Sequence, residues 1–484
     1  MSRLDLRPNQ TRAVQNILND RFHGVFQTPG AGKTAIVLKA ISDLQEVCDI
    51  RRALIIAPLR VIYTTWPDES RKWDQFRHLR LRNLHETSRK DELGFNVVDP
   101  SRDGDIFMIN FEGLPRLFGR PIDQETSSGG VRRVWHAGPW ANWAKRPEML
   151  IVDESTRMKD PQALCSRTLA KYLGDFNRRV ILTGTPAPNG LQDLFGQMLI
   201  LDRGETLGNR VTAFREKFFT PVPMKMRGKS FNQYAAKDGA MATVQNLIKP
   251  HVTVIESADW LKMPDRITVD VPVHLPEKAA KLYKQAKQEA FAQLESGDHF
   301  FATGGAAIKL KQIANGQVYI GEKPNRRVAV VHREKADALA TLLEELGRPA
   351  LVAYEVDADG QYLAKRFKAP VIKGGMAMAE TMELIAKWNR RELPMLLVQP
   401  QAASHGLNMQ AGGDAIVWYT LPWSLETYIQ FNARLCRQGQ AAPSVMVYHL
   451  VASGTVDERV AAVLEGKEAT QDALISALKE EIRA

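Results

Sequence analysis

The sequence predicts an α/β protein of two lobes, each a parallel sheet covered by helices, with helical protrusions between them. Short apolar runs typical of buried strands alternate with helical patterns, as in parallel sheets. The runs form one series before Gly204 and a second after Arg348, separated by sequence of a different kind. A chain of 484 residues is also too long for one compact core, which favours two lobes.

The predicted strands fall in order along both series. The first series comprises Val25-Phe26, Ala53 to Ala57, Ile106 to Ile109, Met149 to Val152, and Val180 to Leu182. The second comprises Ala350 to Ala353, Val371-Ile372, Met395 to Val398, Ala415 to Tyr419, and Val445 to Leu450. Long helical patterns, Glu277 to Leu294 and Glu334 to Leu346, fall between the two series. We therefore expect a first lobe (1–203, with an insertion at 119–147), a hinge and helical protrusion (204–275), a second lobe (276–464) and a C-terminal helix (465–484).

The string QTPGAGKT, residues 27–34, lies between a predicted strand and a predicted helix, as a phosphate-binding loop does. Glycines let backbone N–H groups close around phosphate oxygens, and the helix N-terminus adds partial positive charge. We expect Lys33 to contact the outer phosphates and Thr34 to ligate Mg²⁺. The expected nucleotide-binding residues of this loop are Thr28, Pro29, Gly30, Ala31, Gly32, Lys33 and Thr34. Because Gln27 stands where the full pattern has glycine, an ordinary glycine-rich turn is the alternative.

Two carboxylates end the apolar run Met149 to Val152 in the string IVDEST. We expect Asp153 to hold Mg²⁺, through its waters, and Glu154 to orient and polarise the attacking water. A carboxylate pair by itself is more often a solvated strand end or a helix cap. The phosphate-binding loop upstream favours the metal site.

The string QFNARLCRQGQ, residues 430–440, belongs to a predicted helix from Ser424 to Gln438. Gln430, Arg434 and Arg437 recur at spacings of four and three, so one helix face would present them together. Guanidinium groups suit the charge of a phosphoryl transition state, and an arginine finger contributes roughly a thousandfold or more. We expect these arginines to meet Lys33 and Glu154 at a shared triphosphate. The alternative is a basic helix face in solvent.

Composition narrows the class of protein. The formal net charge of +10 fits a phosphate-rich partner, although the excess is modest for this length. Cys48, Cys165 and Cys436 form no CxxC pair, which argues against a disulfide framework or a cysteine-based zinc site. No apolar run approaches the roughly twenty residues of a membrane span, and the N-terminus lacks a signal peptide's apolar core. We expect a soluble, cytoplasmic protein.

The predicted insertion contains Trp135, Trp140 and Trp143. Exposed tryptophans could stack on bases, whereas buried ones would pack the insertion onto the lobe. We favour packing because large aromatic side chains are mostly buried.

With these strings in order, the chain resembles the superfamily-two helicase-type ATPases, and within them the Snf-type (Swi/Snf-like) branch that includes compact phage-encoded members. LRPNQTRAV resembles the branch's LRPYQ signature, ILTGTPAPN its TGTP element and TVDERV its closing TIEERI. LIIAPLRVIYTTWPDESRKW is similar to its strand, proline and Trp segment. IKLKQIANGQVYI is similar to the helix that opens its second lobe, and ASHGLNMQAGGDAIVWYTLPWS to its GLGLNL segment.

The resemblance implies two RecA-like lobes, ATP and Mg²⁺ as cofactors, and DNA as the partner. It implies Gln10 at the adenine with Arg7 nearby, Gln430 among the nucleotide contacts, and Thr183 and Thr185 as the residues that couple hydrolysis to lobe movement. The nucleic-acid contacts it implies are Pro58, Leu59, Arg60, Gly406 and Asn408.

Two departures from the family pattern stand out. Asp-Glu-Ser-Thr replaces Asp-Glu-Ala-His, which leaves Thr156 in place of a histidine, and Ile255-Glu256 replaces an arginine pair. We expect a DNA-dependent ATPase that translocates on DNA, as a helicase or a duplex-remodelling motor, with duplex preferred and little base specificity. The alternatives are an RNA helicase and an ATP-switched nucleic-acid-binding scaffold without motor activity.

Overall fold

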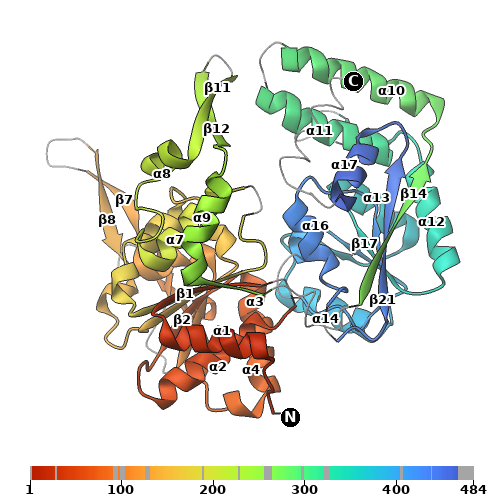
Figure 1. The fold of residues 1–484 in the computed structure, drawn as a ribbon. Coiled ribbons are helices and arrows are strands. Elements are labelled where there is room, and N and C mark those ends of the chain that lie inside the picture. The colour runs from red at the N-terminus through yellow and green to blue at the C-terminus, as the bar shows by residue number, and fades with distance from the viewer. Residues whose placement is uncertain are drawn as a thin grey trace. The chain divides into compact units, whose positions relative to one another are not determined.

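The computed structural model describes residues 3–27, 30–90, 96–98, 104–125, 131–187, 190–226, 229–255, 264–295, 299–320, 327–403, 407–437 and 439–466. The chain divides into two compact units (Figure 1). Unit 1 comprises Met1–Thr220 with Ala235–Trp260, and unit 2 comprises Pro221–Tyr234 with Leu261–Ala484. The predicted site residues Thr28, Pro29 and Gly406, and residues 467–484 of the predicted C-terminal helix, lie outside the described residues.

Unit 1 is built on a parallel sheet that has seven strands among the described residues, in the order β13-β1-β10-β9-β2-β6-β3. The strands are β1 (Phe22–Gln27), β2 (Ala53–Ile56), β3 (Leu81–Asn83), β6 (Ile106–Ile109), β9 (Met149–Asp153), β10 (Arg178–Thr183) and β13 (Val252–Ile255). The helices are α1 (Pro8–Asn19), α2 (Lys33–Glu46), α3 (Leu59–Tyr63), α4 (Thr65–Lys72), α5 (Leu114–Phe118), α6 (Leu164–Ala170) and α7 (Gln192–Asp202). The edge strands β3 and β13 are additions to the predicted series.

Burial explains why these runs form a covered sheet. Every residue of β2, β6 and β9 is buried, as strands with helices on both faces require. The helices α1, α2 and α4 pack together on one face, and α7 lies on the opposite face (Figure 1). The predicted apolar stripe of α2, from Ile36 to Leu44, is confirmed as buried.

The predicted insertion in unit 1 forms an antiparallel hairpin of β7 (Gly119–Glu125) and β8 (Val131–Ala137). Trp140 is fully buried, and its indole N–H donates to Asp175 Oδ2 at 2.7 Å. Trp143 is buried edge-on against Phe107, with ring centroids 4.7 Å apart. The packing interpretation is confirmed for these two tryptophans. A second small hairpin pairs β4 (Ser88–Lys90) with β5 (Asn96–Val98).

The stretch predicted as a hinge and helical protrusion contains both helices and strands. It includes α8 (Val211–Phe218), a hairpin of β11 (Phe219–Met226) and β12 (Lys229–Ala236), and α9 (Ala240–Ile248). β13 then joins the sheet of unit 1 beside β1.

Unit 2 is built on a second parallel sheet, six-stranded among the described residues, in the order β14-β21-β20-β17-β19-β18. The strands are β14 (Asp265–Val273), β17 (Ala350–Ala353), β18 (Val371–Ile372), β19 (Met395–Val398), β20 (Ala415–Trp418) and β21 (Ser444–Ala452). The helices are α10 (Glu277–Glu295), α11 (His299–Asn315), α12 (Glu334–Leu346), α13 (Asp357–Phe367), α14 (Met378–Asn389), α15 (Pro400–Ala403), α16 (Leu425–Asn432) and α17 (Val456–Glu465). A hairpin of β15 (Gln317–Ile320) and β16 (Arg327–Val330) follows α11.

The second sheet is covered on both faces. Successive residues of a strand point to opposite faces. Leu351 and Ala353 of β17 belong to one buried cluster, and Ala350 and Val352 belong to another. The predicted fold class, two parallel sheets each covered by helices, is confirmed. No helix among the described residues combines the length and apolarity needed to cross a membrane.

Candidate active site

Three of the predicted segments end neighbouring strands of the first sheet. Strand β10 lies between β1 and β9, and its register pairs Thr183 with Phe26 and Leu182 with Asp153. All these strands are parallel, so Gln27, Thr183 and Asp153 lie at the same carboxyl edge. This edge is where open parallel sheets bind ligands.

The phosphate-binding loop has the backbone conformation that its glycines allow. Gly30 and Gly32 have φ values of 81° and 95°, in the left-handed region that favours glycine. Lys33 begins α2, and its ammonium donates to the Gln27 carbonyl at 2.9 Å. The positive φ of Gly32 favours glycine, and a Cβ atom there would lie 2.6 Å from Gln10 Nε2 and displace that amide.

Two glutamine amides hold this loop from inside the protein. Gln27 Nε2 donates to the Ala31 carbonyl at 2.6 Å, and Gln10 Nε2 donates to the same oxygen at 2.9 Å. Gln10 Oε1 accepts from the backbone N–H of Arg7, at the start of α1, at 3.0 Å. Gln27 therefore stabilises the loop at the position where the full pattern has glycine. Gln10, predicted at the adenine, lies against the phosphate-binding loop.

The Asp153 carboxylate is buried and held by two donors. The Trp66 indole N–H donates to Oδ2 at 3.1 Å, and the Glu154 backbone N–H donates to Oδ1 at 3.0 Å. Burial and the Glu154 charge raise the pKa of Asp153 and the Lys33 charge opposes the rise, which leaves the pKa at about 6. The structure therefore brings Lys33, Asp153 and Glu154 together as electrostatic neighbours.

Trp66 is a site residue that the motif analysis missed. It is fully buried in α4, and it reaches a carboxylate 87 residues further along the chain. The chemistry of the side chain could have indicated Trp66, because the N–H of a buried indole needs a hydrogen-bond acceptor.

Glu154 adopts a conformation that is uncommon for a residue with a side chain. Its φ and ψ are both 54°, in the left-handed region, where such residues are strained. Its Oε2 atom is buried and has no hydrogen-bond partner among the described residues. Such an atom costs about 1–3 kcal/mol, which fits a group that faces a ligand.

The TGTP element follows β10. Thr183 is fully buried, and its hydroxyl oxygen accepts from the Thr185 backbone N–H at 3.1 Å. The Thr185 hydroxyl oxygen is buried without a hydrogen-bond partner among the described residues. Three buried polar atoms at this carboxyl edge, Gln27 Oε1, Glu154 Oε2 and Thr185 Oγ1, thus have no partner among the described residues.

The segment predicted to contact nucleic acid extends this edge. Pro58 follows β2, the neighbour of β9, and Leu59 begins α3. Burial lowers the pKa of the Arg60 guanidinium, and its Nη1 atom has no partner among the described residues. Arg60 therefore carries hydrogen-bonding capacity that the described protein leaves unused.

The predicted helix from Ser424 to Gln438 is wrong at its C-terminal end. α16 ends at Asn432, whose Oδ1 accepts from the Trp418 indole N–H at 3.0 Å. Beyond it, Arg434 N donates to Phe431 O and Leu435 N to Asn432 O, so three-residue turns replace the α-helix. These turns, rather than one helix face, position the two arginines.

The two arginines have different surroundings within unit 2. Arg434 is buried and donates to the Gln430 carbonyl at 3.0 Å and the Leu407 carbonyl at 3.2 Å. Arg437 is half-buried and donates to Asn408 Oδ1 at 2.7 Å. The Gln430 side chain donates to Glu426. The structure therefore joins the predicted residues Asn408 and Arg437.

One other group of side chains among the described residues could hold a metal ion, namely Asp270, His449 and Glu465. Both ring nitrogens of His449 are already engaged, Nδ1 by Asp270 at 2.9 Å and Nε2 by the Tyr428 hydroxyl at 2.9 Å. His449 is therefore a buried structural histidine.

Comparison with known proteins identifies the class. The SNF2-related domain family matches residues 24–317, and the helicase conserved C-terminal domain family matches residues 323–439. The chain belongs to the SNF2-related family. The resemblance to the Snf-type branch is thereby confirmed, and the chain is an ATP-dependent helicase-type enzyme.

Proteins similar to this chain differ in length. Protein p41 of Acyrthosiphon pisum secondary endosymbiont phage 1 is 30% identical over 485 residues, 98% of each chain. The Chromodomain-helicase-DNA-binding protein 3 homolog of Caenorhabditis elegans is 25% identical over 344 residues, 66% of this chain but 18% of that protein. The Sulfolobus solfataricus SWI2/SNF2 ATPase core in complex with dsDNA has a TM-score of 0.42 and 20% identity, covering 99% of this chain and 97% of that one.

Proposed function

We propose that this protein is a DNA-dependent ATPase that translocates along duplex DNA with little base specificity. The observation that carries the proposal is the group of Lys33, Asp153 and Glu154 at the carboxyl edge of the first sheet, with one buried Glu154 oxygen that lacks a partner among the described residues. A lysine beside two carboxylates after a phosphate-binding loop suits nucleotide triphosphate hydrolysis.

The loop residues Gly30 to Thr34, with Thr28 and Pro29 before them, are proposed to bind the phosphates. Left-handed glycines turn backbone N–H groups inward, and the first turn of α2 adds its partial positive charge. The Lys33 ammonium, now on the Gln27 carbonyl, would move to the outer phosphate oxygens. Gln10 and Arg7 would contact the phosphate-binding loop and the adenine base of the nucleotide.

The oxygen donors at this site fit Mg²⁺, which prefers carboxylate, hydroxyl and water oxygens. Asp153 and Thr34 are the residues proposed to hold it. When bound, Mg²⁺ neutralises charge on the phosphate oxygens. The Trp66 and Glu154 N–H groups fix the orientation of the Asp153 carboxylate before the metal arrives.

Glu154 is proposed to orient and polarise the attacking water. Its carboxylate has an unused buried oxygen, and a hydrogen bond from water would satisfy it. Arg434 and Arg437 are proposed to stabilise the charge of the transition state. Arg437 is the stronger candidate, because Arg434 is committed to two backbone carbonyls.

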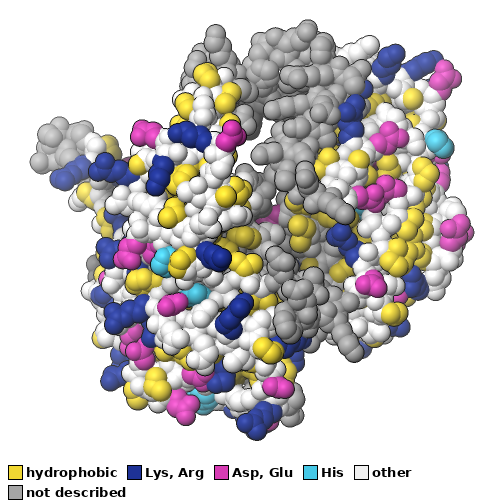
Figure 2. All heavy atoms as spheres, viewed as in Figure 1, with side chains coloured by type: hydrophobic (Ala, Val, Ile, Leu, Met, Phe, Trp, Pro, Cys, Tyr) yellow, Lys and Arg dark blue, Asp and Glu magenta, His cyan; other side chains and the backbone are white. Residues whose placement is uncertain are grey.

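Several observations support DNA as the partner. A family relative is named as a helicase and DNA-binding protein, and the chain carries a net charge of +10. On the face seen in Figure 2, Lys and Arg side chains are spread among acidic ones. Low base specificity is expected because contacts to the phosphate backbone carry no sequence information. Pro58, Leu59 and Arg60, with Gly406 and Asn408, are the proposed contacts, and Thr183 and Thr185 the coupling residues.

Phosphate release measured with duplex DNA, single-stranded DNA and RNA tests the partner. We expect duplex DNA of unrelated sequences to stimulate release most, and Lys33→Ala to abolish it. Stimulation mainly by RNA would indicate an RNA helicase. Absence of release with every nucleic acid would indicate a scaffold.

Displacement of a third strand from a DNA triplex tests translocation. We expect ATP-dependent displacement by the wild-type protein and none by Lys33→Ala. Forked and blunt duplexes should stay paired, and unwinding of both would show that the protein separates strands.

A further inference from the structure

Helix α7 packs unusually closely on the turn that follows Glu154. That turn, η5 (Ser155–Met158), begins directly after the strained residue. A Cβ atom on Gly196 of α7 would lie 2.3 Å from the Met158 carbonyl oxygen and 2.4 Å from the Lys159 carbonyl oxygen. Only glycine permits this approach, and it brings the next residue, Gln197, against Ser155.

The Gln197 side chain is fully buried and joins two catalytic segments. Its Oε1 accepts from the Ser155 hydroxyl at 2.7 Å. Its Nε2 donates to the Pro186 carbonyl at 2.6 Å and to the Asp193 carbonyl at 2.8 Å. One amide therefore connects the residue after Glu154 with the residue after Thr185.

The TGTP loop, residues 183–187 of the part that the structure describes, also borders a cavity. Gly184, Pro186 and Ala187 line a cavity of about 620 Å³, which Gln27 and residues of α9 and β13 also line. A cavity of that size leaves the loop room to shift, unlike a packed core. A shift of the Pro186 carbonyl would act on Gln197, because the fully buried Gln197 amide donates directly to that oxygen.

We propose that Gln197 is a positioning residue that couples the TGTP loop to Glu154 through Ser155. The inference rests on the proposed function and names the contact that regulates its catalytic carboxylate. When nucleic acid binding shifts the TGTP loop, the Gln197 amide transmits the shift to Ser155 and changes the orientation of Glu154. Gln197 itself touches neither nucleotide nor water.

The test is the stimulation factor, the DNA-stimulated kcat divided by the basal kcat. In Gln197→Met, which keeps the volume but removes donor and acceptor, we expect this factor to fall about tenfold, within the usual range of coupling effects. The KM for ATP should stay unchanged. A merely structural residue would lower both rates together and leave the factor as it was.

A second series separates coupling from misfolding. Ser155→Ala should lower the factor as Gln197→Met does, and the double variant should be no worse than either single variant. Ser155→Thr, which keeps the hydroxyl, should retain stimulation. Gln192→Met on the same helix is the control, because its amide contacts Arg215 instead.

The outcomes distinguish the two proposals. If Gln197→Met fails to fold in a thermal melt, the Ser155 variants decide. An unchanged factor in Ser155→Ala, or additive losses in the double variant, would overturn the coupling alone. A wild-type enzyme that no nucleic acid stimulates would overturn the coupling and the proposed function together.

Discussion

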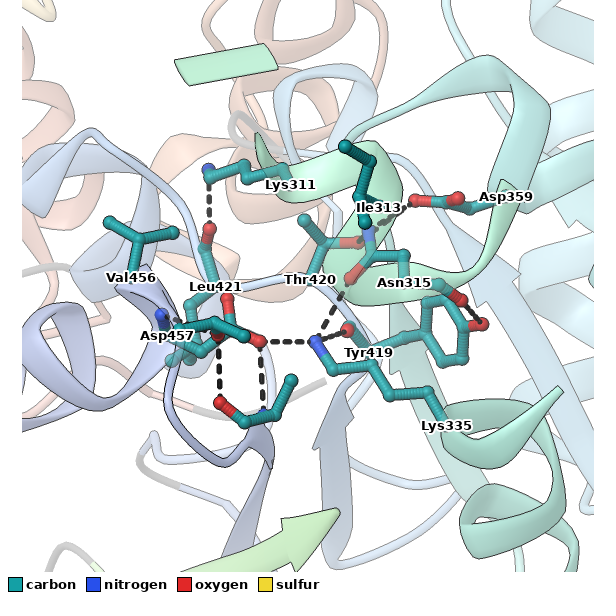
Figure 3. A network of polar contacts seen from close by, with 12 residues as sticks. Lys311, Ile313, Asn315, Lys335, Asp359, Tyr419, Thr420, Leu421, Val456 and Asp457 are labelled. Atoms are coloured by element: carbon teal, nitrogen blue, oxygen red, sulfur yellow. Dashed lines mark hydrogen bonds and ion pairs between the residues drawn. The ribbon is translucent and has the colours of Figure 1, made fainter. Parts of the chain in front are cut away.

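Buried polar side chains have opposite surroundings at the carboxyl edge of the first sheet and in the polar core of unit 2. This polar core is the hydrogen-bonded network of Lys311, Asn315, Lys335, Asp359 and Asp457. At the first, Glu154 Oε2 and Thr185 Oγ1 are buried without partners among the described residues. In the second, the fully buried Lys335 ammonium donates to three oxygens, Asn315 Oδ1, the Tyr419 carbonyl and Asp457 Oδ2 (Figure 3). Burying a polar group costs free energy unless it is bonded. Glu154 and Thr185 therefore keep hydrogen-bonding capacity that a ligand could use, whereas the Lys335 ammonium is engaged within the protein.

The polar core of unit 2 joins elements that are far apart in sequence. Lys335 of α12 meets Asp457 of α17, and Asn315 of α11 donates to Asp359 of α13 at 2.7 Å. Lys311 donates to the Leu421 carbonyl in the segment before α16 (Figure 3). Because each of these groups is satisfied, the network fixes the helices relative to the second sheet.

The largest expected effect concerns Arg437, which is half-buried and belongs to unit 2 but is proposed as a catalytic residue and not as part of the polar core. Arg437→Ala should reduce turnover about a thousandfold with ATP affinity retained, since the contact forms in the transition state. Steady-state phosphate release and nucleotide binding measure the two quantities. Arg390→Ala, which removes an exposed ion pair with Glu392, is the control. Unchanged turnover would remove Arg437 from the catalytic set.

Removing the buried lysine tests the scaffold side. Lys335→Met should lower the free energy of unfolding of unit 2 by about 3–5 kcal/mol, because Asp457 is left buried and uncompensated. Chemical denaturation measures the loss. Lys281→Met, which breaks an exposed helical pair with Glu277, should change little. Equal effects of the two substitutions would show that the network is not structural.

A smaller effect concerns the metal site. Trp66→Phe removes the donor to Asp153 Oδ2, so half-saturation of ATPase activity should need about ten times more Mg²⁺. Trp73→Phe is the matched control, because its indole donates to Glu69 instead. The same Mg²⁺ dependence in both variants would show that Trp66 does not contribute to metal binding.

The smallest effect is a pH dependence in the polar core. Burial raises the pKa of Asp359 to about 7, above that of an unfolded aspartate. The folded protein therefore binds a proton that the unfolded chain releases, and this contribution to stability grows as the pH falls through 7. Relative to Asp359→Asn, the wild type should be about 1 kcal/mol more stable at pH 6 than at pH 8. A difference that is constant with pH would contradict this.

Local pattern explains what could be predicted from the sequence. The phosphate-binding loop, the carboxylate pair and most strands depend on neighbours in the chain, so spacing and apolarity indicated them. The periodicity of Gln430, Arg434 and Arg437 predicts a helix through Arg437. The helix ends at Asn432 instead, where the Trp418 indole N–H donates to the Asn432 side chain and turns follow.

Long-range contacts explain what the sequence did not reveal. Trp66 reaches Asp153, and Gln197 reaches Ser155, across 87 and 42 residues. No spacing rule relates such pairs, and only the packed sheet and its helices bring them together. Strand β3 has one apolar residue in three, which does not distinguish it from a loop, whereas β13 is apolar at three of its four positions but falls in the stretch interpreted as a hinge.

Conservative substitutions of two carboxylates, compared in one assay, bear most directly on the central claim that Glu154 is a catalytic group and Asp457 a structural group. The measurement is phosphate release per folded molecule with saturating ATP, Mg²⁺ and duplex DNA. Glu154→Gln should lose about a thousandfold in rate without losing stability. Asp457→Asn should melt at a lower temperature and turn over normally. Normal turnover in Glu154→Gln would contradict the account.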